Sequence, residues 1–408
     1  MEENSEGLKN NMRIVIATPI LYNSASPFNH LFKDIIGGFL NDGNQIVRLV
    51  AVENEKDIEF KYGYVGDNIE YKLFKRKKND KNNIFSRYIT DSITNIKEAL
   101  AILKLKDVDV LFEDVSYSSF WSVAVAKIKK IKIIAMIQDV WPDNATQSNI
   151  ISQKSIVYKY FELWQRFVYK NADKIVCISD DMKDFIVGKG ISENKIDVIY
   201  NWGYSDDIVD IPWEKSKFVK KFNLDKKKFY AIYAGNIGKM QNVGIIVDAA
   251  KELEDKEDIH FFIIGDGAKK DDILKALKNV KNVSILPMQP SELALHIYSA
   301  AGVNLISLVE GGLKTALPSK TGVVLSCGKP TIFTFGQNSS FIKQLEKFHA
   351  GESVEPWDSH GLAKKIIEIK ELNQIKSDNV YKFFREYFVR EQNIQRYKNL
   401  IRGIKQNE

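Results

Sequence analysis

The chain has 408 residues, of which 44% are hydrophobic and 27% are charged, so it can form two or three domains with ordinary cores. Its formal charge of +6 is small for this length, which argues against a nucleic-acid-binding protein with a concentrated basic face. Two cysteines, Cys177 and Cys327, lie far apart in sequence. They argue against a disulfide framework or a thiolate metal site and favour a reducing cytoplasm.

Residues 1–11 are polar and acidic, so we expect a flexible N-terminus without a secretory signal. No window of the chain approaches the roughly 18 uninterrupted apolar residues of a membrane-spanning helix. The sequence therefore predicts a cytoplasmic protein whose only membrane contact is peripheral.

Alternating strand and helix patterns predict a first Rossmann-like domain over residues 12–203. A helix is expected at residues 29–41, ended by Asp42-Gly43. The predicted strands, which are short β-rich runs, occupy residues 13–19, 45–52, 108–113, 132–138 and 174–179.

Basic residues crowd one segment of this domain and are interleaved with Phe74, Ile84, Phe85 and Tyr88. The bases are Lys72, Lys75, Arg76, Lys77, Lys78 and Lys81. Two interpretations stay open. The segment is either an ordinary solvated surface or a patch that rests on anionic lipid headgroups, where each base adds about 1 kcal/mol.

The alternation restarts after the turn-rich residues 201–207 and predicts a second Rossmann-like domain over residues 204–379. Strands are expected at 229–234, 260–264, 283–286, 303–308 and 330–335, and helices at 243–253, at 270–278 and from Pro318. Residues 380–403 form one amphipathic run, and residues 380–408 are predicted to be a terminal helix that packs back on the first domain. The predicted fold class is α/β, with two doubly wound domains facing each other across a cleft.

Glycine-rich turns follow two predicted strands of the second domain. They are Gly235-Asn236-Ile237-Gly238 and Gly265-Asp266-Gly267. At the carboxyl ends of parallel strands, such turns let a diphosphate approach the backbone amides. Each turn alone is equally consistent with a plain tight turn, in which Asp266 bonds its own backbone.

The segment Pro318-Ser319-Lys320 adds a cation at a predicted helix start. Proline suits the first turn of a helix, and the positive end of the helix attracts anions. A purely structural helix start would not need a lysine there, because its charge opposes the helix dipole. We therefore predict that Lys320 binds a phosphate group.

In spacing and order, these segments with Gln241 and Gly328-Lys329-Pro330 resemble bacterial retaining glycosyltransferases of family 4, which have the GT-B fold. The chain is most similar to the branch that builds capsular, O-antigen and exopolysaccharide repeat units. Trp141-Pro142-Asp143 after Gln138-Asp139, and Tyr200-Asn201-Trp202, also match that branch. The resemblance extends over residues 12 to about 370.

The resemblance implies a hexosyl- or N-acetylhexosaminyltransferase that takes a UDP-sugar in the second domain and a polyprenyl-diphosphate-linked acceptor in the first. It implies no metal cofactor, because lysine and amides can neutralise the leaving diphosphate. It also places the enzyme at the inner leaflet of the membrane, with a protein partner or a second copy as a further expected partner.

The expected catalytic residues are Asp139 and Lys320. The expected donor-binding residues are Gly235, Asn236, Gly238, Lys239, Gln241, Gly265, Asp266, Gly267, Met288, Gly311, Gly312, Leu313, Lys314, Thr315, Pro318, Ser319 and Lys320. The expected acceptor-binding residues are Asn23, Ser24, Phe28, Asn29, Gln138 and Trp141.

The chain departs from the family pattern near the donor. Asn236 and Gln241 stand where many members have Arg and Lys, and Thr315 and Val323 stand where many have a pair of glutamates. We expect Lys320, Lys314 and Lys239 to compensate, together with the amides of residues 311–314, and the donor ribose to be held differently.

Several alternatives remain. Asp139 orients the acceptor if the reaction retains configuration, and is the general base if it inverts. His30 is better explained as a helix-cap residue, Trp141 and Trp202 as packing residues, and Asp107 to Asp109 as a strand start. Two other classes of protein stay open, a UDP-sugar 2-epimerase-like enzyme and an inactive auxiliary subunit of another glycosyltransferase.

Overall fold

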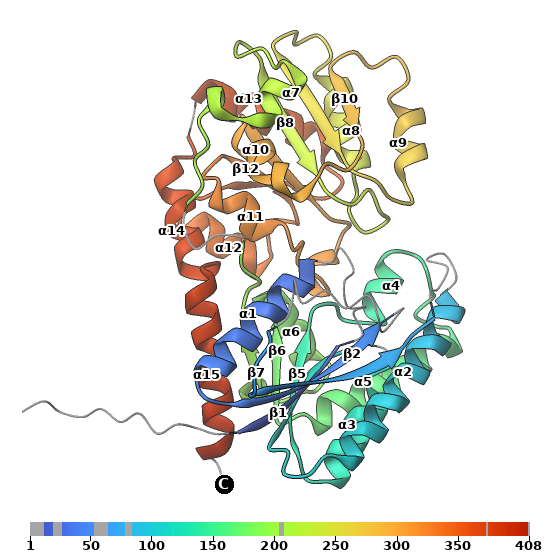
Figure 1. Cartoon of the computed structure of the whole chain (residues 1–408). Helices are drawn as coiled ribbons and strands as arrows, with labels where there is room; N and C mark the ends of the chain where they lie inside the picture. The colour runs from blue at the N-terminus through green and yellow to red at the C-terminus, as the bar shows by residue number, and fades with distance from the viewer. Residues whose placement is uncertain are drawn as a thin grey trace, which may run out of the picture.

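Two parallel sheets, one in each half of the chain, organise the computed structural model in Figure 1. The structure describes residues 12–18, 27–52, 64–77, 84–116, 118–203, 208–372 and 374–406. The N-terminus predicted to be flexible, residues 1–11, lies outside these ranges. Helices cover both faces of each sheet, and the two sheets lie one above the other in the figure.

The N-terminal sheet has the strand order β3-β2-β1-β4-β5-β6-β7. Its strands are β1 (Arg13–Ala17), β2 (Gln45–Val52), β3 (Ile69–Lys75), β4 (Val110–Asp114), β5 (Lys132–Ile137), β6 (Lys174–Cys177) and β7 (Ile196–Val198). Its helices are α1 (Pro27–Asn41), α2 (Ile84–Lys104), α3 (Phe120–Ile128), α4 (Asp143–Gln147), α5 (Ile156–Asn171) and α6 (Asp180–Gly188). The central strands are buried along nearly their whole length, as expected for a sheet covered on both faces.

The C-terminal sheet has the order β10-β9-β8-β11-β12-β13. Its strands are β8 (Phe229–Ala234), β9 (Ile259–Ile264), β10 (Val283–Leu286), β11 (Val303–Ser307), β12 (Thr331–Thr334) and β13 (Glu352–Ser353). Its helices are α7 (Lys217–Phe222), α8 (Gly244–Glu252), α9 (Lys270–Ala276), α10 (Ala294–Ser299), α11 (Thr321–Ser326), α12 (Ser340–Lys347) and α13 (Ser359–Leu372).

The chain reverses its direction of growth across each sheet at one point. In the N-terminal sheet this switch lies between β1 and β4, and in the C-terminal sheet between β8 and β11. Loops on either side of such a switch diverge and leave a crevice at the carboxyl ends of the strands, where ligands of open α/β sheets bind. The expected sites therefore lie at the ends of β1, β4, β8 and β11.

The predicted fold class, two Rossmann-like α/β domains, is confirmed. Three strands were not among the predicted ones: β3, β7 and β13. The two shorter ones, β7 and β13, have three and two residues, and β3 lies at the sheet edge with mostly half-buried side chains. None of them shows the continuous apolar run that marked the central strands.

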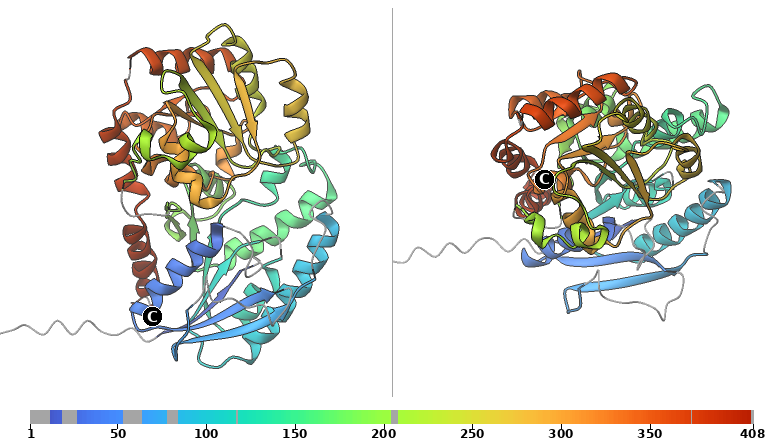
Figure 2. Two further views of the ribbon diagram at one scale, coloured as in Figure 1. Left: turned by 45° about the horizontal axis from the view of Figure 1, so that its top comes forward. Right: turned by 90° about the horizontal axis from the view of Figure 1, so that it is seen from above.

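The end of the chain crosses from one domain to the other. The prediction of a single helical run over residues 380–403 is wrong, because two helices, α14 (Ser377–Tyr387) and α15 (Arg390–Gln406), meet at the fully buried Phe388. Helix α14 packs on α11 of the C-terminal domain, and α15 packs along α1 of the N-terminal domain, as Figures 1 and 2 show.

Both apolar and ionic contacts hold α15 in place. Tyr397 and Ile401 are buried in the core that contains Phe112 of β4. At the surface, Lys398 and Arg402 contact the Asp42 carboxylate at 2.7 and 2.6 Å. The last helix is therefore part of the N-terminal domain's core, although it comes from the opposite end of the chain.

We predict that Ile401→Ala lowers the free energy of unfolding of the N-terminal domain by about 2–5 kcal/mol, because it leaves a cavity under α15. Leu372→Ala, an exposed apolar truncation in α13, should change it by less than about 0.5 kcal/mol. Urea unfolding followed by circular dichroism measures both. Equal stability of the two variants would show that α15 contributes no core packing.

Candidate active site

The two glycine-rich turns lie against each other at the carboxyl edge of the C-terminal sheet. The Ile237 amide donates to the Asp266 carbonyl at 2.8 Å, and the Gly235 amide donates to the Ile264 carbonyl at 2.9 Å. A Cβ atom on Gly265 would lie 1.8 Å from the Gly235 carbonyl oxygen, which no side chain can tolerate. Glycine is therefore required at residue 265 for the close approach of these two loops.

In the turn Gly265-Asp266-Gly267, the Asp266 side chain bonds to its own backbone segment, as one of the two interpretations expected. The Asp266 carboxylate accepts from the Gly267 amide at 2.9 Å and lies 3.5 Å from the Lys270 ammonium. Met288, in the loop after β10 at the same edge, is exposed. These residues line the rim of the edge, and their contact with a donor stays a prediction.

Lys320 lies at the end of β8 and beside Gly235. Its ammonium donates to the Ala234 carbonyl at 2.9 Å and lies 3.7 Å above the centre of the Tyr233 ring. No carboxylate among the described residues lies within ion-pair distance of it. Burial of the ammonium lowers the pKa of Lys320 to about 7. The structure thus holds a desolvated amine without a counter-charge at the switch point of the sheet.

The cause of the unusual properties of Lys320 differs from the predicted one, which was its place at the start of a helix. Helix α11 begins at Thr321 and has six residues, so Lys320 is its N-cap residue and the dipole behind it is short. The Thr321 hydroxyl, rather than that of Ser319, closes the turn by donating to the Pro318 carbonyl at 2.7 Å. Burial against Tyr233 and Ala234 therefore sets the properties of this lysine more than the helix end does.

Asn236 and Gln241 bond to each other at the positions where the family resemblance would place cations. The Asn236 amide nitrogen donates to the Gln241 side-chain oxygen at 3.2 Å. A Cβ atom on Gly238 would lie within 2.7 Å of both side chains, so the glycine makes room for the pair. This part of the edge is neutral, and the exposed Lys239 lies beside it.

The loop after β11 bends sharply at Gly311, whose φ of +71° favours glycine. A short 3₁₀ turn, Gly312–Lys314, follows. Two of the four amides predicted to bind phosphate are already used, because the Gly312 amide donates to the Val309 carbonyl and the Lys314 amide to the Gly311 carbonyl. Leu313 is buried, whereas the Lys314 side chain is exposed.

This loop joins the C-terminal domain to the N-terminal one. Gln147 of α4 donates to the Gly311 carbonyl at 2.7 Å and accepts from the hydroxyl of the fully buried Thr315. The Val140 amide donates to the Thr315 carbonyl at 2.8 Å, and Asp139 pairs with Ala316 as an antiparallel bridge. The predicted donor loop and the predicted catalytic Asp139 are therefore neighbours across the domain boundary.

Three predicted residues after β5 have different surroundings. Asp139 is exposed next to the domain boundary, and partial loss of water around its carboxyl raises its pKa. Gln138 is buried and accepts from the Asn201 amide at 2.6 Å, so it forms a side-chain pair within the N-terminal domain. Trp141 packs edge-on against Phe161, which fits its interpretation as a packing residue.

The predicted acceptor loop after β1 is largely outside the described residues. Asn23 and Ser24 lie there, and the side chain of Phe28 is not described. Asn29 is buried in the first turn of α1, and His30 beside it is exposed. Their contact with an acceptor stays a prediction.

A buried acidic cluster at the end of β4 was not predicted. Burial raises the pKa of Glu113 and of Glu98, on α2, to about 8, and that of Asp114 to about 7. The Thr18 hydroxyl at the end of β1 donates to Asp114 at 2.7 Å, which ties the two strand ends of the switch point together. The sequence offered one indication of this cluster, the two consecutive acids Glu113 and Asp114 at the end of a predicted strand.

Comparisons with known proteins agree with this architecture. Residues 65–202 match the family described as Glycosyltransferase Family 4, and residues 214–386 match Glycosyl transferases group 1. A glycosyltransferase structure from Rickettsia africae superposes with a TM-score of 0.70 at 15% identity, covering 98% of this chain and 100% of that one. Anabaena Alr3699/HepE in complex with UDP and glucose superposes with a TM-score of 0.68 at 12% identity, covering 96% and 99%. The chain has the GT-B fold.

Curated relatives of the GT-B chain match over part of their length. The probable glycosyltransferase WbjE of Pseudomonas aeruginosa is 27% identical over 247 residues, which cover 59% of this chain and 60% of WbjE. The putative colanic acid biosynthesis glycosyl transferase WcaI of Escherichia coli is 24% identical, with 59% and 60% covered. The match thus spans about three fifths of these relatives. The solved structures support the GT-B fold, and the matched families and relatives are described as glycosyltransferases.

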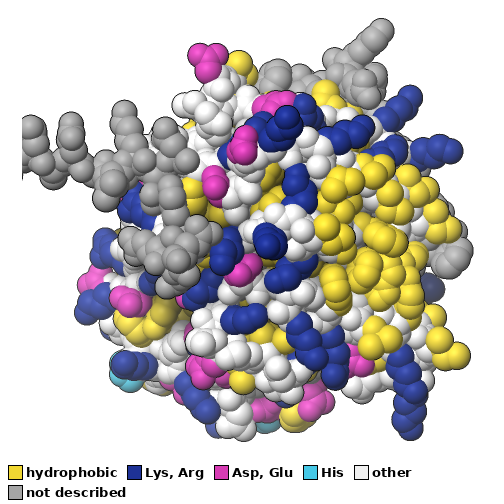
Figure 3. Space-filling view, turned by 90° about the horizontal axis from the view of Figure 1, so that it is seen from below, with side chains coloured by type: hydrophobic (Ala, Val, Ile, Leu, Met, Phe, Trp, Pro, Cys, Tyr) yellow, Lys and Arg dark blue, Asp and Glu magenta, His cyan; other side chains and the backbone are white. Residues whose placement is uncertain are grey.

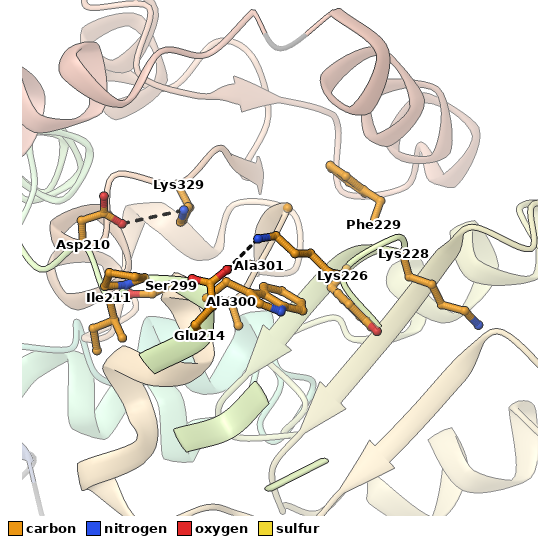
Figure 4. A pocket seen from close by; sticks show the side chains of 14 residues that line it. Asp210, Ile211, Glu214, Lys226, Lys228, Phe229, Ser299, Ala300, Ala301 and Lys329 are labelled. Carbon is orange, nitrogen blue, oxygen red and sulfur yellow. Dashed lines mark hydrogen bonds and ion pairs between the residues drawn. The ribbon is translucent and has the colours of Figure 1, made fainter. Parts of the chain in front are cut away.

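A pocket of about 450 Å³ lies at the amino edge of the C-terminal sheet, where β8 begins (Figure 4). Ion pairs cross or flank it, Lys226 with Glu214 at 2.6 Å and Lys329 with Asp210 at 3.9 Å. This is the amino edge of the strands, on the far side of the sheet from Lys320. A nucleotide is expected at the carboxyl edge instead.

The part of the chain that the structure describes lacks two further features. The described residues contain no group of three or more His, Cys, Asp or Glu side chains arranged to hold a metal ion. They also include no helix with the length and apolarity needed to cross a membrane.

We predict that Lys320→Met stabilises the unliganded protein by about 1 kcal/mol or more near pH 7, because it removes a buried charge that has no counter-charge. The pKa of Lys320 is about 7 in the folded chain, below the ordinary 10.5. The folded state therefore binds fewer protons between these values, and the cost of the lysine is full below pH 7 and falls as the pH rises.

Urea unfolding of wild type and variant, near pH 7 and again near pH 10, measures this difference. The gap in unfolding free energy should narrow at the higher pH. Lys239→Met, at an exposed lysine of the same edge, is the matched control and should show no such gap. A Lys320→Met protein that is less stable at both pH values contradicts the prediction.

Proposed function

We propose that this chain transfers a glycosyl group from a UDP-sugar to a lipid-linked oligosaccharide in surface polysaccharide biosynthesis. The observation that carries the proposal is Lys320, whose buried ammonium has no counter-charge among the described residues. A diphosphate held beside Gly235 supplies that charge. Desolvated, preorganised cations stabilise a departing phosphate more strongly than solvated ones.

Names of similar proteins support the donor and the process. Structures of HepE with UDP and with UDP-glucose share the fold of this chain, which favours a uridine nucleotide. The name of WcaI refers to colanic acid biosynthesis, which favours an extracellular polysaccharide. To this donor and process the proposal adds a lipid-linked acceptor and a location at the inner leaflet of the membrane.

In the proposed reaction, an acceptor hydroxyl attacks the anomeric carbon from the side on which UDP leaves. The bond between that carbon and the β-phosphate oxygen breaks, the new glycosidic bond forms, and the departing phosphate oxygen takes the hydroxyl proton. The configuration is retained and no protein base is consumed. Lys320 stabilises the developing negative charge on the diphosphate, which removes the need for a metal ion.

Asp139 acts in this scheme as a positioning residue. Its backbone is tied to Ala316 of the donor loop, the residue is exposed, and it lines a small pocket with Trp141. A carboxylate there can accept a hydrogen bond from an acceptor hydroxyl and direct it toward the donor. The raised pKa means that this ability is lost at a higher pH than for an ordinary aspartate as the solution is acidified.

One observation favours a second candidate, an auxiliary subunit of another glycosyltransferase. The pair of Asn236 and Gln241 leaves the donor edge with fewer cations than the resemblance implies. Such a subunit would show activity only with its partner, and that activity would survive Lys320→Ala. The epimerase alternative gains nothing from the structure, because His296 and His360 bond to the Lys217 amide and to Glu252.

We predict that Lys320→Ala weakens UDP binding about 10- to 150-fold, the loss expected for a hydrogen bond to a charged group. Isothermal titration calorimetry measures the affinity. Lys239→Ala removes an exposed cation near the same edge and should change the affinity less than about fivefold.

The variant Lys320→Arg tests whether proton uptake on UDP binding comes from residue 320, because it keeps a positive charge there that does not titrate near neutral pH. Bound diphosphate should raise the pKa of Lys320, so near pH 8 the wild type should take up a proton on binding UDP, and affinity should fall as the pH rises above about 7. The arginine variant stays charged and should show no proton uptake. Titrations in buffers of different ionisation enthalpy measure the uptake. Equal uptake by both proteins would assign it to another group.

We predict that Asp139→Asn lowers kcat about tenfold while the affinity for UDP stays unchanged, as for a positioning residue. Transfer from a UDP-sugar to a lipid-linked acceptor, with the product anomer assigned by NMR, is the measurement. A loss of about 10⁴-fold together with an inverted product would instead make Asp139 the general base.

A further inference from the structure

The outward face of α2 is apolar, whereas several polar side chains lie on its inward face. Ile89, Ile93, Ile96, Leu100 and Leu103 are each 40–53% exposed. Their spacing alternates between four and three residues, which places them in one stripe along the helix. A surface helix of a globular domain normally turns such a stripe toward the core.

The buried side of α2 carries the polar residues instead. Asp91 bonds to Arg76, with 2.8 Å between the Arg76 Nε and a carboxylate oxygen. Asn95 donates to the Ser122 hydroxyl at 3.1 Å, and the buried Glu98 lies within hydrogen-bond distance of the same amide. These hydrogen bonds, together with the buried Ala99 and Ile102, hold α2 against its domain, and the apolar stripe is left facing outward.

The apolar surface continues over the two neighbouring helices, α3 and α5. Ile128 of α3 is 77% exposed, and Ile156 and Leu163 of α5 are 86% and 67% exposed. Trp121 and Tyr160 complete the face with exposed aromatic rings. Figure 3 shows this area as one broad hydrophobic region on one side of the molecule. We call it the α2–α3–α5 face.

Basic side chains surround the α2–α3–α5 face. The exposed ones on the three helices are Lys97, Lys104, Lys127, Lys159, Arg166 and Lys170. The acidic Glu162 is held by Arg166 at 3.3 Å. Figure 3 shows dark blue side chains along the borders of the yellow region. A face with an apolar centre and a positive border is complementary to an anionic lipid bilayer.

We propose that the α2–α3–α5 face rests on an anionic membrane surface, with α2 lying in the plane of the headgroups. The inference deepens the proposed function, since it supplies the surface from which a lipid-linked acceptor is reached. Trp121 and Tyr160 have the amphipathic rings that concentrate at membrane interfaces.

This surface differs from the basic segment predicted from the sequence. Arg76 of that segment is turned inward to Asp91, and Lys72 pairs with Glu70. Lys78 and Lys81 lie outside the described residues. Lys75 and Lys77 of the segment are exposed, and its interpretation as a lipid-binding patch stays a prediction.

Aromatic side chains connect the face to the candidate active site. The rings of Trp121 and Trp164 are 6.3 Å apart, and those of Phe120 and Trp164 are 4.3 Å apart. Phe120, Trp164 and Trp141 line a small pocket that also contains Asp139. An acceptor whose lipid part lies in the bilayer can thus meet an apolar surface on its way to Asp139.

Co-sedimentation with vesicles tests the proposal on the full chain without donor or acceptor. Wild type should bind vesicles of phosphatidylglycerol and phosphatidylethanolamine, and the double variant Ile96→Asp/Leu100→Asp should bind at least tenfold more weakly. Leu274→Asp/Leu372→Asp places the same change at exposed apolar residues of the C-terminal domain and should bind as wild type does.

Charge variants test the basic border in the same assay. Lys97→Glu/Lys104→Glu should lower binding to the anionic vesicles at least tenfold, and added salt should lower wild-type binding. Lys251→Glu/Lys256→Glu, at exposed lysines of the C-terminal domain, is the control and should bind as wild type does. Blue-shifted tryptophan emission on vesicles, lost in Trp121→Phe, places that ring at the membrane.

The proposal is overturned if wild type stays in solution with anionic vesicles, or if the variants and their controls bind alike. Sedimentation velocity that shows a dimer broken by Ile96→Asp/Leu100→Asp, with no vesicle binding, would assign the face to a second copy. UDP affinity should be unchanged in all these variants. Failure of membrane binding is thereby separate from failure of the proposed transferase function.

Discussion

One ammonium group, that of Lys320, is buried at the carboxyl edge of the C-terminal sheet without a counter-charge among the described residues. Lys320 contacts the Ala234 carbonyl and the Tyr233 ring, and these partners hold the side chain without neutralising its charge. A neutral lysine would fit the site of the free protein, whereas a bound polyanion favours the charged form. In the proposed function, the free-energy cost of burying this ammonium in the unliganded fold is recovered when a diphosphate binds. Asn236 and Gln241, being neutral, leave that role to the lysine.

Directional contacts hold the two domains together at their boundary. Gln147 and Thr315 hold the donor loop against α4, and the strand-like pairing of Asp139 with Ala316 sets the distance between the two halves of the site. Far along the chain, α15 returns to the N-terminal domain and is anchored by Tyr397 and Asp42. At a second place, the Asp181 carboxylate of α6 accepts from the Ser340 and Phe341 amides of α12, each at 2.8 Å. The covalent crossings and these two hydrogen-bonded interfaces therefore position the domains. A change in any of them alters the geometry between donor and acceptor.

The sequence predicted features that depend on local chemistry. Central strands were recognised because they are buried on both faces, and the two glycine turns because backbone approach requires them. The sequence also singled out Lys320, although the cause it suggested, a helix dipole, is minor beside burial. What it could not supply were contacts between distant residues, such as Asn236 with Gln241, Gln147 with Thr315, and the partners of Gln138. The end of one helix and the start of the next around Phe388 depend on the same long-range packing.

Helix α2 illustrates why periodicity alone misleads. Its apolar stripe has the spacing of a core-facing helix, yet the helix is rotated so that Asp91, Asn95 and Glu98 face inward. Burial raises the pKa of Glu98 and Glu113 to about 8, so both carboxyls are largely neutral near pH 7 and can be accommodated away from water. Because hydrogen bonds are directional, they fix the rotation of the helix more sharply than apolar packing would. The outward apolar stripe is the consequence of that polar anchoring, and covering it with lipid would release its ordered water without disturbing the anchor.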